Sequence, residues 1–264
     1  MRMSGYDDLA GKVVLVTGAS RGIGFAVSQA LTELGAIVIM ASQTDKIFEA
    51  AENISKKNLA IIAPHVVDVG EYAEVLKLVQ SSVKKFGKID ALINCAAIMG
   101  STGPLEENDP LEWAKTINVN LIGTFNLMKA LIMQMKMQGF GSIINFSGGG
   151  AASPSPNFSA YGCSKAAVVR LTETVAQELA DTLIKVNVIA PGANDTDMYK
   201  IFVRAGGVAR TVVTIDKPVT LALFLASNKS MGITGKFIHV FDDYVNFIPD
   251  EIGGELFTLR RVEP

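Results

Sequence analysis

Tyr161 and Lys165, four residues apart, are the side chains in this 264-residue sequence whose types and spacing suit acid–base chemistry. They open a stretch with helical patterning, so both side chains lie on one face of a helix. A phenol with a pKa of about 10 exchanges protons poorly at neutral pH. A lysine cation one turn away, together with an oxidised nicotinamide, would favour phenolate and lower that pKa. The pair suits proton transfer to or from a carbonyl or alcohol oxygen while a cofactor moves hydride.

A glycine-rich turn near the amino end joins a strand-like run to a helix-like run. It reads Thr17-Gly18-Ala19-Ser20-Arg21-Gly22-Ile23-Gly24. Glycine permits a sharp turn and close approach to a ligand, and the following helix offers unpaired N–H groups to a pyrophosphate. The turn lacks the lysine and hydroxyl residue of a P-loop, which disfavours a nucleoside triphosphatase. A tight connection without a ligand is the alternative, but the place after the first strand favours dinucleotide binding.

The end of the second expected strand bears on which dinucleotide binds. An acid there would bind the adenosine ribose 2′-OH of NAD. The sequence instead reads Ser42-Gln43-Thr44, with no acid before Asp45. Arg21 could face a 2′-phosphate, and Ser42 could donate a hydrogen bond to it. We therefore expect NADP in preference to NAD; an Arg21 in solvent, unrelated to the cofactor, is the alternative.

Short apolar runs rich in β-branched residues alternate with longer amphipathic stretches along nearly the whole chain. The expected strands are Lys12–Thr17, Ala36–Ala41, Leu59–Val66, Ala91–Asn94, Ser142–Ser147, Lys185–Ala190 and Lys236–Phe241. The expected helices are Gly22–Leu34, Lys46–Lys56, Glu71–Phe86, Leu111–Met137, Ala160–Asp181 and Pro218–Ser227. This alternation predicts an α/β protein with one doubly wound parallel sheet, a Rossmann fold, and helices on both faces. No linker interrupts it, so we expect a single domain over residues 1–264.

Composition excludes several classes of protein. A formal net charge of −2 gives no electrostatic reason to expect a nucleic-acid partner. Two cysteines, Cys95 and Cys163, are too few for a disulfide framework and lack metal-ligand spacing. No apolar run approaches the roughly 18 residues of a membrane-spanning helix, and the amino end lacks a signal-peptide core. We expect a cytoplasmic protein with no metal and no membrane partner.

Two segments near the carboxyl end are expected to shape the surroundings of the site. The segment Tyr199–Val213 would cover the substrate, and Gly206-Gly207 within it would permit lid motion. The extension Pro249–Pro264 mixes apolar residues with two arginines. It is either solvated or packed on a neighbouring subunit, and the sequence leaves both open.

With these motifs in hand, the sequence resembles the short-chain dehydrogenase/reductase family over about residues 11–241. The matching pieces, in the family's order, are Thr17–Gly24, Asp68-Val69, Asn94-Cys95-Ala96-Ala97, Asn120, Tyr161 with Lys165, and Pro191-Gly192 through Thr196-Asp197-Met198. The resemblance implies an oxidoreductase that moves hydride between NADP(H) or NAD(H) and a small carbonyl or alcohol substrate. It also implies a homo-oligomer, a dimer or tetramer, formed through the helices at 111–137 and 160–181.

On the adenosine side, the resemblance assigns adenine contacts to Asp68 and Val69, and the adenosine wall to Asn94 and Ala96. The family usually has Asn-Asn-Ala-Gly where this chain has Asn94-Cys95-Ala96-Ala97. The substituted residues are small, so we expect binding to be retained.

On the nicotinamide side, the resemblance assigns the acid/base role to Tyr161. Lys165 would bind the nicotinamide ribose and lower the tyrosine pKa, and Asn120 would hold a water in a proton relay. Thr196 and the Pro191-Gly192 turn would orient the carboxamide.

The sequence departs from the family at the catalytic serine. That serine normally lies thirteen residues before the tyrosine, which is Gly148 here, and Ser147 is one position upstream. A one-residue shift along a strand turns a side chain to the other face, although the glycines at 148–150 could re-aim Ser147 or supply N–H donors themselves. Losing such a donor costs on the order of 10²–10³ in rate by analogy with acyl transfer. The first hypothesis is an oxidoreductase with Ser147 as oxyanion donor; the alternative is a catalytically impaired dinucleotide-binding or sensing protein.

Overall fold

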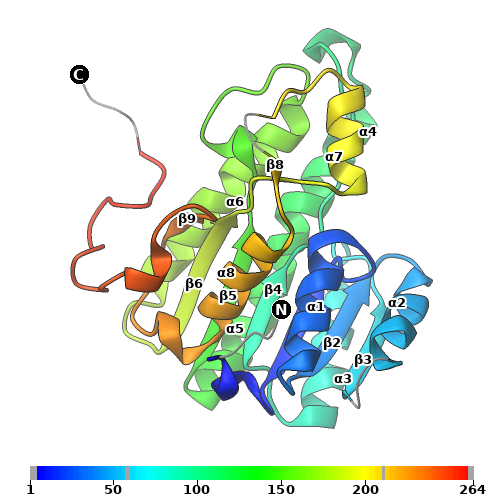
Figure 1. Ribbon diagram of the computed structural model, residues 1–264. Helices are drawn as coiled ribbons and strands as arrows, with labels where there is room; N and C mark the ends of the chain where they lie inside the picture. Colours follow the sequence, from blue (N-terminus) through cyan, green and yellow to red (C-terminus); the bar gives the residue numbers. More distant parts are fainter. Residues whose placement is uncertain (1–4, 57–59, 210–211, 261–264) are drawn as a thin grey trace.

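The computed structural model describes residues 5–56, 60–209 and 212–260. Seven parallel strands form one sheet in the order β3-β2-β1-β4-β5-β6-β9 (Figure 1). They are β1 (Val13–Thr17), β2 (Ile37–Ser42), β3 (Ile62–Val66), β4 (Ala91–Asn94), β5 (Gly141–Phe146), β6 (Ile184–Ala190) and β9 (Phe237–His239). The seven strands expected from the sequence and the doubly wound sheet are confirmed. The amino end of the third expected strand, Leu59, lies outside the described residues.

Helices cover both faces of the sheet because side chains alternate along each strand. Val14 and Val16 of β1 are buried in one core, and Val13 and Leu15 in the other. The first core is covered by α1 (Gly22–Glu33), α2 (Lys46–Ser55) and α8 (Asp216–Ala226). The second face carries α3 (Tyr72–Phe86), α4 (Pro110–Ile117), α5 (Gly123–Gln138) and α6 (Ser159–Glu178). In Figure 1, α7 (Asp197–Arg204) stands above the carboxyl ends of the strands.

The stretch expected as one helix over Leu111–Met137 is helical throughout, but a π-helical turn at Asn118–Ile122 interrupts its α-helical hydrogen bonding and divides it into α4 and α5. Asn120 is fully buried there, and its side-chain amide bonds the chain after β4. Its Oδ1 accepts from the Ile98 N–H at 2.8 Å, and its Nδ2 donates to the Ile98 carbonyl at 3.0 Å. Nδ2 also donates to the Ser164 hydroxyl of α6 at 3.0 Å. This long-range bonding fixes the turn, a type of irregularity that often marks functional sites.

The strands of the sheet centre end level with one another. Thr17 pairs in register with Asn94, and Asn94 with Asn145. The Asn94 amide donates to Asn145 Oδ1 at 2.8 Å, so buried side chains tie β4 to β5. The segments that follow β1, β4 and β5 therefore leave the sheet at one edge.

A short pair of strands that the sequence analysis missed lies beyond this edge. β7 (Ala193–Asn194) pairs in parallel with β8 (Val212–Val213) and closes the segment that contains α7. Two-residue strands carry no periodicity to detect. Of the expected cover segment Tyr199–Val213, residues 210–211 lie outside the described residues.

The extension after Pro249 packs on its own chain, an arrangement that the sequence analysis did not anticipate. The Phe237 N–H of β9 donates to the Phe257 carbonyl at 2.6 Å, so the extension lies along the edge of the sheet that β9 forms. Glu173 of α6 is buried and accepts from the Leu259 N–H at 2.6 Å and from the Arg260 guanidinium at 3.1 Å. Residues 261–264 lie outside the described residues.

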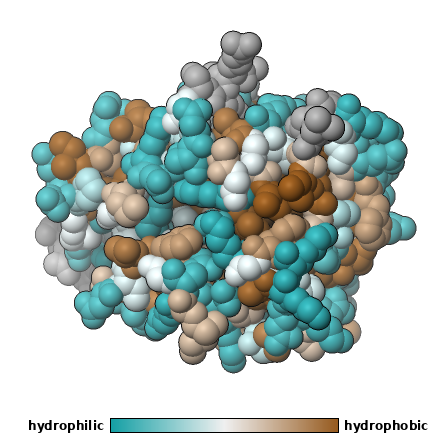
Figure 2. All heavy atoms as spheres, turned by 90° about the horizontal axis from the view of Figure 1, so that it is seen from below, coloured by the Kyte–Doolittle hydropathy of each residue, from teal (hydrophilic) through white to brown (hydrophobic). Residues whose placement is uncertain are grey.

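The opposite end of the molecule, below the amino ends of the strands, is closed by polar contacts. Lys185 is buried and donates to the carbonyls of Leu225 and Ser227 at 3.0 and 2.9 Å, which caps α8. Seen from below, most surface residues are hydrophilic, and the hydrophobic ones lie in separate groups (Figure 2). Within the described ranges, no helix has the length and apolar character needed to cross a membrane.

We expect Glu173→Gln to lower the free energy of unfolding by about 1–3 kcal/mol, because the variant removes a buried, charge-assisted acceptor for the extension. Glu178→Gln, on an exposed position of the same helix, should change it by no more than about 0.5 kcal/mol. Urea denaturation of both variants measures the difference. Equal stability of the two variants would show that the extension does not depend on Glu173.

Candidate active site

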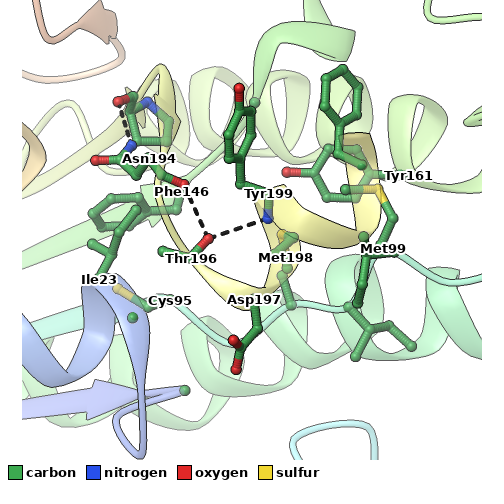
Figure 3. Close-up of a pocket in the computed structure, with 18 of the residues that line it drawn as sticks. Ile23, Cys95, Met99, Phe146, Tyr161, Asn194, Thr196, Asp197, Met198 and Tyr199 are labelled. Carbon is green, nitrogen blue, oxygen red and sulfur yellow. Dashed lines mark hydrogen bonds between the residues drawn. The ribbon is translucent and has the colours of Figure 1, made fainter. Parts of the chain in front are cut away.

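A cavity of about 1360 Å³ opens at the carboxyl edge of the sheet. It runs from the end of β2, past the glycine turn, to the space beneath α7. Figure 3 shows its α7 end, where the hydroxyl of Tyr161 points toward Tyr199 and where Met99 and Met198 also line the cavity. Every residue that the sequence analysis assigned to the cofactor or to catalysis lines this cavity, except Asn94 and Asn120, which lie behind its wall.

The glycine turn is packed so closely that side chains are excluded. Gly18 has a φ of +63°, and a Cβ there would lie 2.8 Å from the backbone nitrogen of Ala96. A Cβ on Gly24 would lie 2.5 Å from the carbonyl oxygen of Gly18. The Ala96 N–H donates to Thr17 Oγ1 at 3.2 Å and holds the segment after β4 against the turn. The turn therefore presents bare backbone to the cavity, as a pyrophosphate site requires.

The end of β2 is held by hydroxyl and carboxylate contacts. Ser42 donates to the Ser20 hydroxyl at 3.0 Å, which joins β2 to the glycine turn. Asp68 accepts from the Gln43 amide at 2.7 Å and from the Gly70 N–H at 2.9 Å. These contacts fix the walls of the cavity on the side where an adenosine would bind. Lys46, which the sequence analysis did not single out, also lines this end.

Arg21 points away from the end of β2. Its Nη1 lies 3.3 Å from Asp197 Oδ2, at the first residue of α7. Both side chains are largely exposed, with accessibilities of 73% and 58%. The guanidinium is thus drawn toward α7 rather than toward Ser42.

Tyr161 and Lys165 lie one turn apart in α6, as expected. Lys165 is buried; its Nζ donates to the Phe146 carbonyl at 2.8 Å and lies 5.7 Å from the Tyr161 ring centre. Burial lowers the pKa of Lys165 to about 8 and raises the pKa of Tyr161 to about 12. The expected lowering of the tyrosine pKa by Lys165 is therefore not seen, because desolvation of the phenolate dominates.

Gly148 lies directly against Tyr161. A Cβ on Gly148 would lie 2.8 Å from the Tyr161 hydroxyl oxygen, so this oxygen fills the room that a side chain would need. Ser147 is buried, and its hydroxyl donates to the Lys165 carbonyl at 3.3 Å. In this geometry the hydroxyl is bonded to the backbone of α6, and the role of Ser147 as oxyanion donor stays a prediction.

The turn after β6 is locked by its own side chains. Asn194 is buried and donates to the carbonyls of Pro191 and Gly192 at 2.9 and 3.0 Å. Thr196 caps α7: its hydroxyl accepts from the Tyr199 N–H at 3.3 Å and donates to the Asn194 carbonyl at 3.2 Å (Figure 3). The start of α7 is thereby fixed beside the glycine turn, with Thr196 Cγ2 at 3.4 Å from where a Gly22 Cβ would lie.

The wall beneath α7 consists mainly of apolar side chains, part of them from the expected cover segment Tyr199–Val213. Phe158 and Phe202 contact each other with ring centres 4.9 Å apart. The lining residues that lie outside the motifs and the cover segment assigned to the site from the sequence include Met99, Phe146, Phe158, His239 and Phe241. Scattered aromatic and methionine residues carry no spacing signal, so only the folded chain brings them together.

Comparison with known proteins identifies the family. The profile described as short chain dehydrogenase matches residues 12–205, most of the chain. The chain is a short-chain dehydrogenase/reductase. The 3-oxoacyl-(acyl-carrier-protein) reductase of Thermotoga maritima is 35% identical over 243 residues, which are 88% of this chain and 97% of that protein. Dehydrogenase/reductase SDR family member 4 of Homo sapiens is 36% identical over 200 residues, 75% of this chain and 72% of that one.

Solved structures of other short-chain dehydrogenases share the fold. Levodione reductase is 26% identical with a TM-score of 0.83, covering 87% of this chain and 96% of its own. NAD⁺-bound xylitol dehydrogenase is 29% identical with a TM-score of 0.82, covering 88% and 98%. A short chain dehydrogenase from Escherichia coli CFT073, complexed with NADPH, is 25% identical with a TM-score of 0.82, covering 89% and 99%. The Rossmann-like fold and the oxidoreductase class of this short-chain dehydrogenase/reductase follow from these similarities.

We expect Gly18→Ala to abolish nucleotide binding and to destabilise the fold, because it combines a strained backbone with a clash against Ala96. Gly87→Ala is the matched control: Gly87 has a φ of +80° but nothing lies within 4 Å of its Cβ position. The control should lose only about 1–2 kcal/mol of unfolding free energy and keep its nucleotide affinity. Thermal unfolding and fluorescence titration with NADPH measure the two effects. Equal losses in both variants would refute the close-packing argument.

Proposed function

We propose that this short-chain dehydrogenase/reductase reduces a carbonyl to an alcohol with a nicotinamide dinucleotide, and that Tyr161 donates the proton. The observation that carries the proposal is the Tyr161 hydroxyl facing the cavity, beside Lys165 and on the same sheet edge as the glycine turn. When bound, the nicotinamide supplies the hydride. The chain's own residues hold the two reactants and supply the proton.

The residues present fit such a cofactor. The backbone cradle at Gly18 and Gly24 has no room for a side chain, which suits a pyrophosphate. Asn194, which lines the cavity, keeps a buried Oδ1 without a hydrogen-bond partner among the described residues, an acceptor that a donor group of the nucleotide would satisfy. Relatives bound to NAD⁺ and to NADPH support either nucleotide.

We favour NADP(H) because of the residue types at the end of β2. Ser42 and Thr44 offer hydroxyls there, and Lys46 lines the same wall. Lys46 is the first residue of α2 and makes no ion pair within the described chain, although a cation is unfavourable at a helix amino end. The negative charge of an adenosine 2′-phosphate would pair with the ammonium group of Lys46. Arg21 remains the second candidate cation.

The electrostatics of the site favour reduction. Because burial raises the pKa of Tyr161 to about 12, the phenol holds its proton at neutral pH and can donate it to a substrate oxygen. Lys165 is cationic below its lowered pKa of about 8 and can support the resulting phenolate. Asn120 acts as a positioning residue, since its side chain joins the segment at Ile98 to Ser164 of α6.

The substrate that fits is an uncharged, apolar carbonyl compound. Near Tyr161 the cavity is lined by Met99, Met198 and Tyr199 (Figure 3). Phe158 and Phe202, whose rings contact each other, line it as well. A carboxylate placed among these apolar side chains would be desolvated at a large cost. Methionine side chains adapt to irregular apolar shapes. Levodione reductase, a structural relative, carries a ketone substrate in its name and supports this class.

Gly148 supports the second candidate, a dinucleotide-binding protein with impaired chemistry. No serine hydroxyl reaches the tyrosine from position 148, and the Ser147 hydroxyl is directed at Lys165. Under this candidate the nucleotide binds while turnover stays negligible.

We expect Tyr161→Phe to reduce kcat for NADPH-dependent reduction of apolar ketones by at least about 10²-fold, because the proton donor is lost. Nucleotide affinity should change by less than about twofold. Steady-state assays across a ketone panel, with NADPH titration of the same samples, provide both readouts. Binding without turnover in the wild-type protein would favour the second candidate.

We expect Gly148→Ala to lower kcat by about tenfold or more, because its Cβ displaces the Tyr161 hydroxyl. Gly148→Ser carries the same Cβ together with a donor, so its rate relative to Gly148→Ala isolates the value of the hydroxyl. We expect the serine variant to be faster than the alanine variant. Rates equal to wild type in both would show that Tyr161 tolerates a side chain at this position.

A further inference from the structure

Asp197 joins two parts of the cavity wall that lie far apart in sequence. It is the first residue of α7, and its Oδ2 lies 3.3 Å from Arg21 Nη1 in the glycine turn. Its other oxygen lies 3.8 Å from Lys200 Nζ, one helical turn further on. The start of α7 also touches the turn through Thr196, which faces the Cβ position of Gly22 at 3.4 Å. The contact between α7 and the glycine turn thus has an apolar part and an ionic part.

The ionic part uses the same guanidinium that an NADP(H) site would use. Arg21 and Lys46 are cations that line the cavity near the ends of β1 and β2, where an adenosine 2′-phosphate would lie. Arginine binds phosphate by a bidentate fork, which needs a guanidinium with a free edge pointing at the phosphate. In the structure Asp197 draws this fork toward α7, and Asp197 would itself repel a phosphate bound to the same group.

We infer that Asp197 withholds Arg21 from the adenosine 2′-phosphate, so that NADP(H) binding and attachment of α7 to the glycine turn compete for one guanidinium. The inference rests on the proposed function, since it concerns the same nucleotide site. Asp197 is then a specificity-determining residue, because it lowers the affinity for NADP(H) and leaves the affinity for NAD(H) unchanged. NADPH, but not NADH, draws Arg21 away from α7, because NADH has no 2′-phosphate.

The expected effects are modest because the pair is exposed. Exposed ion pairs contribute about 0.2–1 kcal/mol, which corresponds to a change in affinity of about 1.4- to fivefold. We therefore expect Asp197→Asn to tighten NADPH binding about two- to fivefold and to leave NADH binding unchanged. Asp195→Asn is the matched control, an exposed carboxylate two residues away that makes no ion pair within the described ranges.

The test measures dissociation constants for NADPH and NADH by fluorescence titration of the full chain. The proteins are wild type, Asp197→Asn, Asp195→Asn, Arg21→Met, and the double variant of Arg21 and Asp197. In the Arg21→Met background, Asp197→Asn should have no further effect on NADPH affinity, since the contested group is gone. Hydrogen exchange of α7 in the nucleotide-free protein gives a second readout: Asp197→Asn should raise it, and Asp195→Asn should not.

The outcomes separate this inference from the proposed function. If the wild-type protein binds neither nucleotide, the proposed function fails. If it binds both and Asp197→Asn weakens NADPH binding, the carboxylate positions Arg21 for the phosphate, and the inference is overturned. Unchanged NADPH affinity in Asp197→Asn, or an equal gain in Asp195→Asn, overturns it as well.

Discussion

The packing of bare backbone at the glycine turn is the constraint on which the rest of the structure depends. Gly18 lies against the backbone at Ala96, and Gly24 against the carbonyl of Gly18, with no room for a methyl group at either position. This closeness requires β1 and β4 to be neighbours and to end level, which the register of Thr17 with Asn94 provides. The helix α1 can then begin at the cavity, and the segments after β4 and β5 converge on the same edge. The cavity is a consequence of strand order and of the two missing side chains.

Desolvation governs the chemistry that this edge can support. Tyr161 and Lys165 are held in an environment that disfavours both of their charged forms, so the pKa of Tyr161 rises to about 12 while that of Lys165 falls to about 8. The bond from Lys165 to the Phe146 carbonyl retains the ammonium where solvent is scarce. In the function proposed above, the neutral phenol and the retained cation would form a proton-donating pair, which suits a substrate oxygen gaining negative charge.

The sequence was sufficient for the architecture because most strands of the sheet are predominantly apolar and most of the helices that cover it are amphipathic. It also identified the glycine turn, the Tyr161 and Lys165 pair and the departure at Gly148, because these are local patterns. It could not show the break at Asn120, which depends on bonds to Ile98 and Ser164 in distant segments. The direction of Ser147 and the ion pair of Arg21 depend on the positions of α6 and α7, and no local pattern encodes them. The shift of the Tyr161 pKa likewise depends on burial by residues from several elements.

The extension from Pro249 alters how this sheet meets its surroundings. A parallel sheet ends in a strand with unpaired N–H and C=O groups, and such an edge invites pairing with another chain. Here the Phe237 N–H already donates to the Phe257 carbonyl. Glu173 of α6 accepts a hydrogen bond from the Leu259 N–H of the same extension. A second copy of this chain can pair a strand with β9 only after the extension has been displaced. Strand pairing between subunits, and edge-to-edge aggregation in the same way, is therefore opposed at the β9 edge, whereas β3 at the other edge of the sheet pairs only with β2 within the described ranges.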